Sequence, residues 1–488
     1  MKRDDTFGVF DHYGDIVAGE GNPEGLYHKD TRYLSEFRLL VNGKRPLLLS
    51  STVQDNNAML TADLTNPDFI ADGRLVLPRD TIHIIRSKFL WDAACHERLG
   101  IRNFGRKSQE IELGFQFAAD FADIFEVRGH RRKRRGETEA ILSPDGIGFV
   151  YRGLDGAVRR CVIRFGRIPD HADPEMALFR LEIAPGASVS LFLTASCREE
   201  APEPSPPRQF FVCLREARRA LRASIARAAS VETSNDIFNE VLCRTMADLY
   251  MLITDTREGP FPYAGIPWFS TAFGRDAIIT AIEMLWIDPA IAKGVLRFLA
   301  TTQAREIRPE ADAEPGKILH EMRSGEMARL GEVPFAFYYG SVDATPLFIV
   351  LAGLYFERTG DVATIRELWP HLEAALAWID EYGDRDGDGF VEYQRLGKTG
   401  LENQGWKDSF DSIFHADGSY AEGAIAVCEV QGYVYAAKRH AAKIAAAIGL
   451  PARAKRLACE AGQLQAHFES AFWCAEIGTY ALALDGRK

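Results

Sequence analysis

Arg198-Glu-Glu-Ala-Pro-Glu-Pro-Ser-Pro-Pro-Arg208 is the stretch that divides this chain into two kinds of structure. It holds four prolines and no large apolar side chain, which is typical of an extended and solvated linker. Apolar residues form short alternating runs before it and recur at helical spacing after it. The stretch therefore predicts a boundary between a β domain and a helical domain.

The segment before this boundary, residues 1–197, predicts an N-terminal antiparallel β-sandwich. Its short apolar runs alternate with turn signals at close spacing, which is the pattern of two packed sheets. One example is Phe37–Val41, which Asn42-Gly43 follows as a hairpin signal. Residues 198–234 then predict a linker and a linking helix.

The remaining segment, residues 235–488, predicts a toroid of paired helices. About seven amphipathic stretches follow one another, separated by long loops. Helix starts are well marked, for example by Asp288-Pro289, a capping residue before a proline. These helices are too few to close a barrel, so we expect the toroid to be truncated in this sequence.

Composition excludes several functional classes. The 488 residues carry a formal net charge of −11, so nucleic-acid binding is not expected. The eight cysteines contain no CxxC pair, which argues against a zinc site or a disulfide framework and is usual in a reducing compartment. We find no signal peptide and no membrane-spanning run, and expect a cytoplasmic protein without a membrane partner. The oligomeric state stays open.

The stretch Gly400-Leu-Glu-Asn-Gln-Gly-Trp-Lys-Asp-Ser-Phe-Asp411 has no apolar period and predicts a loop. Indoles stack on sugar rings, while amides and carboxylates bind hydroxyl groups. A carboxyl beside an indole can be desolvated, which favours the protonated form that a general acid needs. We predict that Asp408 is the proton donor of a glycosidase and that Gln404, Trp406 and Lys407 bind substrate. The alternative is a polar surface loop with a buried tryptophan anchor.

A further candidate loop leads into a predicted helix at Pro267-Trp-Phe-Ser-Thr-Ala-Phe-Gly-Arg-Asp276. An adjacent Arg275 and Asp276 can bind vicinal hydroxyls, one donating and the other accepting. Trp268 and Phe269 would give the sugar ring an aromatic face. The alternative is that Asp276 only stabilises the helix N-terminus and Arg275 pairs elsewhere.

The segment Lys317-Ile-Leu-His-Glu-Met-Arg323 groups His320, Glu321 and Arg323 as candidate substrate ligands. It lacks the second histidine of an HExxH zinc motif, so a zinc site is excluded.

Two more helix starts carry candidate substrate ligands. Tyr339 and Asp343 precede a predicted helix, where a cap is the alternative role of Asp343. Glu429 and Gln431 lie in another helix start and face either a cavity or solvent.

Asp384-Arg-Asp-Gly-Asp-Gly389 matches the first half of an EF-hand loop, with Asp384, Asp386 and Asp388 as metal ligands. The twelfth position holds Arg395 in place of the bidentate glutamate, so a true EF-hand is not expected. Two interpretations stay open: a structural calcium site completed by a distant carboxylate, and a polar turn of Asp and Gly.

Two charged segments of the β domain are unusual. Gly25–Leu34 contains Asp30 and Arg32, and we favour an ion pair between them that fixes a loop over a segment that reaches a neighbouring active site. The basic run Arg131–Arg135 favours a solvated loop over a phosphate patch.

Together these motifs resemble the bacterial glycogen-debranching-like amylo-α-1,6-glucosidases. They occur in the family's order and span nearly the whole chain. The matching segments are Gly25–Leu34 with its Asp-Thr-Arg-Tyr-Leu, Trp268–Asp276, His320–Arg323, Tyr339–Asp343, Gln404–Asp408 and Glu429–Tyr433.

The resemblance implies a β domain before an (α/α)6 barrel and an inverting α-glucosidase with two carboxyls. Its acid matches Asp408, in a Trp-Lys-Asp similar to the family's Trp-x-Asp. Its general base lies in the last third of the barrel, which we expect beyond Lys488. In inverting enzymes the two carboxyls stand roughly 6.5–9.5 Å apart.

The implied partner is an oligosaccharide or a glycogen-like α-glucan, and no cofactor is required. Three alternatives remain: a hydrolase of another α-glucoside, a non-catalytic carbohydrate-binding protein, and a purely structural protein.

Overall fold

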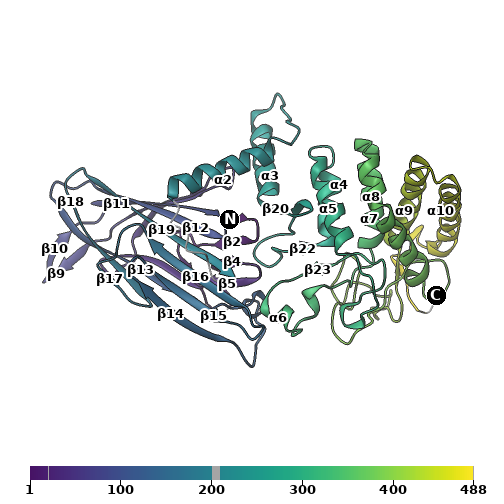
Figure 1. The fold of residues 1–488 in the computed structure, drawn as a ribbon, viewed down its shortest axis with the longest axis horizontal. Coiled ribbons are helices and arrows are strands. Elements are labelled where there is room, and N and C mark those ends of the chain that lie inside the picture. The colour runs from purple at the N-terminus through teal and green to yellow at the C-terminus, as the bar shows by residue number, and fades with distance from the viewer. Residues whose placement is uncertain (20, 200–208, 487–488) are drawn as a thin grey trace.

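The computed structural model describes the chain except for residues 20, 200–208 and 487–488. A β domain and a helical domain lie side by side (Figure 1). The predicted linker falls between β19 (Ser188–Glu199) and α2 (Phe210–Ile225), and most of it lies outside the described residues. α2 is the linking helix that the sequence predicts.

The β domain is built from antiparallel sheets, which confirms the predicted sandwich. The largest sheet has eight strands. In spatial order these are β14 (Glu137–Ser143), β15 (Gly146–Arg152), β16 (Val158–Phe165), β19, β12 (Ala94–Asn103), β11 (Ile82–Trp91), β8 (Leu60–Thr65) and β7 (Leu47–Val53). The second sheet is β17 (His171–Ala172), β18 (Met176–Ile183), β13 (Gln109–Ala118), β6 (Glu36–Val41) and β3 (Ile16–Val17).

Aromatic side chains hold these two sheets together. Phe115 of β13 stacks on Phe37 of β6 with ring centroids 5.9 Å apart, and meets Phe165 of β16 at 6.1 Å across the sandwich. The hairpin predicted at Asn42-Gly43 is wrong, although the turn itself is present, with φ of 45° and 73°. The strands on its two sides belong to different sheets, because β6 pairs with β13 while β7 pairs with β8. The turn therefore transfers the chain between the layers.

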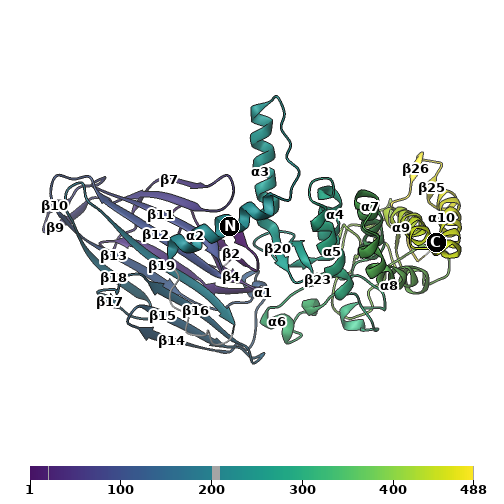
Figure 2. The same ribbon diagram turned by 45° about the horizontal axis from the view of Figure 1, so that its top comes forward.

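The helical domain begins at α3 (Asp236–Leu252). Its other helices are α4 (Gly274–Met284), α5 (Pro289–Thr301), the short α6 (Glu326–Arg329), α7 (Ala344–Thr359), α8 (Val362–Trp378), α9 (Cys428–Ala447) and α10 (Pro451–Phe472). Successive helices pair as α4 with α5, α7 with α8 and α9 with α10. Figure 2 shows them following one another away from the sandwich. Among the described residues, no helix is both long and apolar enough to cross a membrane.

A small sheet of the β domain faces the helical domain. Its strands are β1 (Lys2–Arg3), β2 (Thr6–Val9), β4 (Gly25–His28) and β5 (Thr31–Leu34). The two-residue turn between β4 and β5 is Lys29-Asp30, with φ of 46° and 62°, as this hairpin type requires. The turn carries Asp30 into the neighbouring domain, where it accepts hydrogen bonds from Arg323 Nη1 at 2.9 Å and from the Ser324 backbone at 2.9 Å.

The ion pair expected between Asp30 and Arg32 is therefore wrong. Arg32 pairs with Asp120 of its own domain, its Nε lying 3.2 Å from the carboxylate. Asp30 lies at the tip of the hairpin and contacts Arg323 of the helical domain, whereas Arg32 pairs within the β domain. The Gly25–Leu34 segment therefore contacts the helical domain. Asp123 does the same, capping α1 (Ile124–Val127) and accepting from the Met327 backbone at 3.0 Å.

We predict that Asp30→Ala destabilises the protein strongly. Arg323 would stay buried after losing one of its two carboxylate partners, and breaking a buried ion pair costs about 3–5 kcal/mol. The free energy of unfolding from denaturant titration measures this cost. Arg297→Ala removes a partly exposed pair with Glu367 and should cost less than about 1 kcal/mol. Equal losses of unfolding free energy in Asp30→Ala and Arg297→Ala would contradict the role of the buried Asp30–Arg323 ion pair.

Candidate active site

Three helices of the helical domain begin at neighbouring points, because α7 packs against both α4 and α9. Arg275 and Asp276 lie in the first turn of α4, Asp343 is the N-cap residue of α7, and Glu429 lies in the first turn of α9. Helix N-termini carry partial positive charge and favour carboxylates nearby. The fold thus brings candidate substrate-binding residues from three separate loops close together.

Arg275 joins these loops. Its Nη1 lies 3.2 Å from Asp343 Oδ2 and donates to the Gly405 carbonyl at 2.9 Å. The neighbouring Val342 N–H donates to the Gln404 carbonyl at 2.9 Å. The sequence proposed Arg275 with Asp276 as a hydroxyl-binding pair; Arg275 instead takes the buried Asp343 as its partner, the alternative that the sequence left open. Asp276 remains partly exposed beside it.

The start of α9 reaches the same cluster through Tyr433, which the sequence placed in a matching segment but did not select as a substrate ligand. Tyr433 follows Glu429 by one helical turn, so both side chains lie on one face. Burial, and then the negative charges of Glu429 and Asp343, raise the pKa of the Tyr433 phenol. The spacing of Glu429 and Tyr433 was the available signal.

His320 lies deep beneath this cluster. Its ring makes edge contacts with Phe273 at 5.8 Å and Tyr338 at 5.9 Å. Burial, together with the positive charges of Arg275 and Lys317, lowers the pKa of His320 from 6.5 to about 3. Its Nδ1 atom has no hydrogen-bond partner among the described residues. His320 is therefore a neutral imidazole at ordinary pH.

Glu321 and Arg323 form a second group of buried charged residues, next to Trp268 and Phe269. Arg323 Nε donates to Glu321 at 2.6 Å, and its Nη2 donates to the Trp268 carbonyl at 2.8 Å. Burial raises the pKa of Glu321, although the charge of Arg323 opposes this. Arg128 of the β domain lies over the rings of Trp268 and Phe269, 5.9 and 5.7 Å from their centroids. Both domains thus build the surroundings of Trp268.

The loop at Gly400–Asp411 contributes one deeply buried amide. Gln404 is 1% exposed, yet neither its nitrogen nor its oxygen has a hydrogen-bond partner within the described part of the chain. Buried amides are normally paired, because an unpaired one costs free energy. Since Gln404 lies beside the Arg275–Asp343 pair, a ligand with hydroxyl groups would supply the missing partners.

The rest of this loop is exposed. Trp406 is 57% exposed, with the Lys407 ammonium 5.2 Å from its ring, and Asp408 is also exposed. The alternative of a buried tryptophan anchor is therefore wrong. The free protein does not desolvate Asp408, so any desolvation of this carboxyl must come from bound substrate.

Tyr338 anchors the loop, although the sequence selected its neighbour Tyr339. The Tyr338 hydroxyl donates to Asp312 at 2.8 Å and accepts from the Leu401 backbone at 2.7 Å. Gly400 packs on this hydroxyl with φ of 110°, and a Cβ there would lie 2.5 Å from the oxygen. Only glycine fits this approach.

Two predicted substrate ligands already have protein partners. The Tyr339 hydroxyl donates to the Thr302 carbonyl at 2.7 Å. The Gln431 amide accepts from the Val391 backbone at 2.9 Å, and donates to the Val391 and Val427 carbonyls. This geometry favours a structural role for both, and substrate contact through them stays a prediction.

The predicted metal ligands come together in one turn. Oxygen atoms of Asp384, Asp386 and Asp388 lie within 4.8 Å of one another. The Asp384 carboxylate also accepts from the Gly387 and Gly389 backbones, each at 2.9 Å, which is the geometry of a polar turn. Calcium binding here stays a prediction.

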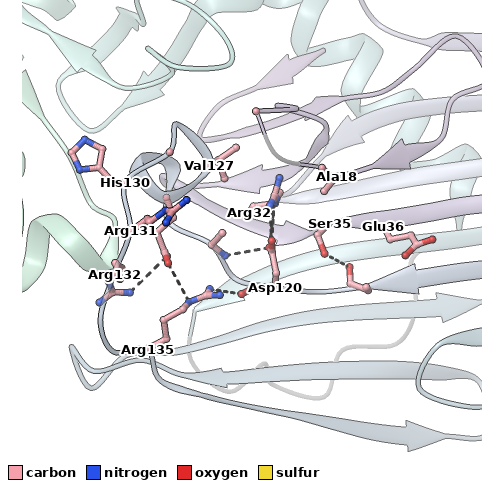
Figure 3. Close-up of a pocket in the computed structure, with 16 residues that line it drawn as sticks. Ala18, Arg32, Ser35, Glu36, Asp120, Val127, His130, Arg131, Arg132 and Arg135 are labelled. Carbon is pink, nitrogen blue, oxygen red and sulfur yellow. Dashed lines mark hydrogen bonds and ion pairs between the residues drawn. The ribbon is translucent and has the colours of Figure 1, made fainter.

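A pocket of about 700 Å³ lies away from these loops. It is in the β domain, and Figure 3 shows its lining. None of the predicted site residues lines it.

Two family models match separate parts of the chain. Residues 1–194 match the N-terminal domain of some glycogen debranching enzymes. Residues 271–485 match the mannosylglycerate hydrolase MGH1-like glycoside hydrolase domain. A search of curated proteins found no match.

Two solved structures share the fold over nearly the whole of this chain. A putative kojibiose phosphorylase from human microbiome is 10% identical with a TM-score of 0.58, over 98% of this chain and 64% of that one. A bacterial glucoamylase complexed with acarbose is 11% identical with a TM-score of 0.53, over 96% of this chain and 68% of that one. The present chain thus spans about two thirds of the phosphorylase's length. The likeness shows the fold, a β-sandwich followed by a helical domain of the (α/α)6 type.

We predict that His320 makes the protein less stable in acid. Between pH 6.5 and 3 the unfolded chain binds a proton that the folded chain excludes, so unfolding becomes easier as pH falls. The contribution is about 1 kcal/mol per pH unit in this window. Denaturant titrations at pH 7 and pH 5 should show a smaller loss for His320→Gln than for wild type. The exposed His171→Gln should behave as wild type; if His320→Gln does so too, the account of His320 fails.

We predict that Gln404→Met stabilises the free protein and weakens sugar binding. Removing an unpaired buried amide should raise the free energy of unfolding by about 1–3 kcal/mol. Gln431→Met is the matched control, because it removes an amide with three hydrogen bonds and should lower stability by a similar amount. A loss of stability in Gln404→Met would show that this amide serves the fold.

Proposed function

We propose that this chain, which matches the N-terminal domain of some glycogen debranching enzymes and an MGH1-like glycoside hydrolase domain, hydrolyses α-glucosidic bonds of an oligosaccharide or glycogen-like α-glucan. The observation that supports this most is the pairing of the two domain matches on one chain, over residues 1–194 and 271–485. The finer assignment, an amylo-α-1,6-glucosidase, rests on the motifs of the sequence.

Asp408 is the general acid in this proposal. It projects from an exposed loop next to Trp406, so it is open to a substrate that lies on the indole. A sugar ring stacked there would exclude water from the carboxyl and favour its protonated form. The carboxylic acid would then protonate the glycosidic oxygen as the bond breaks.

The neighbouring polar groups would hold the sugar hydroxyls. Gln404 offers a donor and an acceptor without protein partners, and Arg275 with Asp343 offers an ion pair at the base of the same loop. Fixed groups of this kind align the anomeric carbon with the attacking water, as an inverting mechanism needs. We assign the acid alone; the second carboxyl is not assigned to a residue.

Substrate panels separate the candidate linkages. A branched dextrin with α-1,6-linked glucose should be the best substrate. Kojibiose and mannosylglycerate belong in the panel because the similar proteins are named for them. Binding of glucan without any glucose release would favour the alternative of a non-catalytic carbohydrate-binding protein.

We predict that Asp408→Asn folds normally and loses about 10²–10⁴-fold in kcat on a branched dextrin, because a carboxamide cannot donate the proton. α-Glucosyl fluoride needs little protonation of its leaving group, so its hydrolysis should fall far less. Both rates can be followed by glucose release. Asp417→Asn changes an exposed carboxylate in the following turn and should leave both rates near wild type.

The two substrates decide the role of Asp408. Equal losses on the dextrin and on the fluoride would indicate a binding or structural defect. Wild-type turnover on the dextrin would remove Asp408 from the mechanism.

A further inference from the structure

The pocket of about 700 Å³ in the β domain lies outside the site proposed for glycoside hydrolysis. It lies beside strands β5 and β6 and the segment 128–135, which follows α1. Its volume falls in the range of about 300–1,000 Å³ that small-molecule sites occupy. We name it the β-domain pocket.

The two sides of the β-domain pocket differ in chemistry (Figure 3). His130, Arg131 and Arg135 lie on one side, all from the basic segment. Ser35 and Glu36, at the start of β6, lie on the other side. One end therefore offers cationic donors, and the other offers a hydroxyl and a carboxylate that can bind neutral hydroxyl groups.

The basic run Arg131–Arg135 is a largely exposed loop, as the sequence favoured, but two of its arginines are held by ion pairs. Arg132 joins the two domains, with Nη1 2.8 Å from Glu326 and Nε 2.7 Å from Glu332. Arg135 pairs with Glu126 at 3.3 Å and donates to the Asp120 carbonyl. These contacts hold the backbone of the segment in place, as a binding site requires.

Arg131 differs from these two arginines. Its guanidinium lines the pocket and has no ion pair or hydrogen bond with any residue that the structure describes. Figure 3 shows it across the hollow from Arg32, whose own charge is neutralised by Asp120. Arg131 is therefore the arginine of this pocket whose charge is available to an anion. Its planar guanidinium donors suit a phosphate.

We propose that the β-domain pocket binds a sugar phosphate. Arg131 binds the phosphate, with Arg135 beside it, and Ser35 and Glu36 contact the sugar hydroxyls. A bare anion would leave the hydroxyl-binding end unused, and a neutral sugar would leave the Arg131 charge unused. A ligand with both ends matches the asymmetry of the lining.

Isothermal titration calorimetry on the full chain, in phosphate-free buffer of low ionic strength, tests this. The probes are glucose 6-phosphate, inorganic phosphate and glucose. We expect glucose 6-phosphate to bind at least about tenfold more tightly than either other probe. Arg131→Gln should weaken its binding by at least about tenfold. Glu36→Gln should weaken glucose 6-phosphate and leave inorganic phosphate unchanged.

Arg134→Gln is the matched control, because Arg134 belongs to the same basic run and does not line the pocket. It should change affinity by no more than about twofold. Equal losses in Arg131→Gln and Arg134→Gln would overturn the proposal, since they would indicate diffuse attraction to the run. Inorganic phosphate or glucose binding as tightly as glucose 6-phosphate, or no binding of any phosphate, would overturn it as well. Circular dichroism confirms that each variant is folded.

Discussion

The buried guanidinium of Arg323 is the constraint on which the rest of the structure depends. Its side chain is 1% exposed, and a charge removed from water in this way must be fully paired. Asp30 of the β domain, Glu321 two residues earlier in the chain and the Trp268 carbonyl share its donors. One cation therefore fixes the β hairpin, the segment that carries His320 and the loop that leads into α4. The β domain is thus part of the scaffold of the candidate site.

Two residues of that site carry buried polar atoms without hydrogen-bond partners among the described residues. Gln404 and the Nδ1 atom of His320 are buried without partners among the described residues, whereas Gln431 on the adjacent helix has every amide group satisfied. Proteins tolerate such unmet groups where a ligand completes them, at some expense in stability. The helix N-termini around Arg275 add a favourable field for carboxylates. These features fit a site for a hydroxyl-rich substrate.

Local pattern predicted the fold well, because periodicity reports which face of an element is buried. The change of period around the proline-rich linker located the two domains, and helix bounds such as Pro289–Thr301 followed from capping residues. Partners distant in sequence could not be predicted in this way. Asp30 meets Arg323 across 293 positions and Arg275 meets Asp343 across 68, so tertiary packing alone decides them. The sequence selected the loop residues by their chemistry, and the role of Asp408 remains to be tested.

The central claim is that this chain hydrolyses α-glucosidic bonds with inversion. Proton nuclear magnetic resonance can follow the anomeric signal of glucose during the first minutes of reaction with a branched α-1,6-linked dextrin. The account predicts that β-glucose forms first and then mutarotates, because water attacks the face opposite the departing glycosidic oxygen. Initial release of α-glucose would contradict inversion, and the absence of any released sugar would contradict hydrolysis.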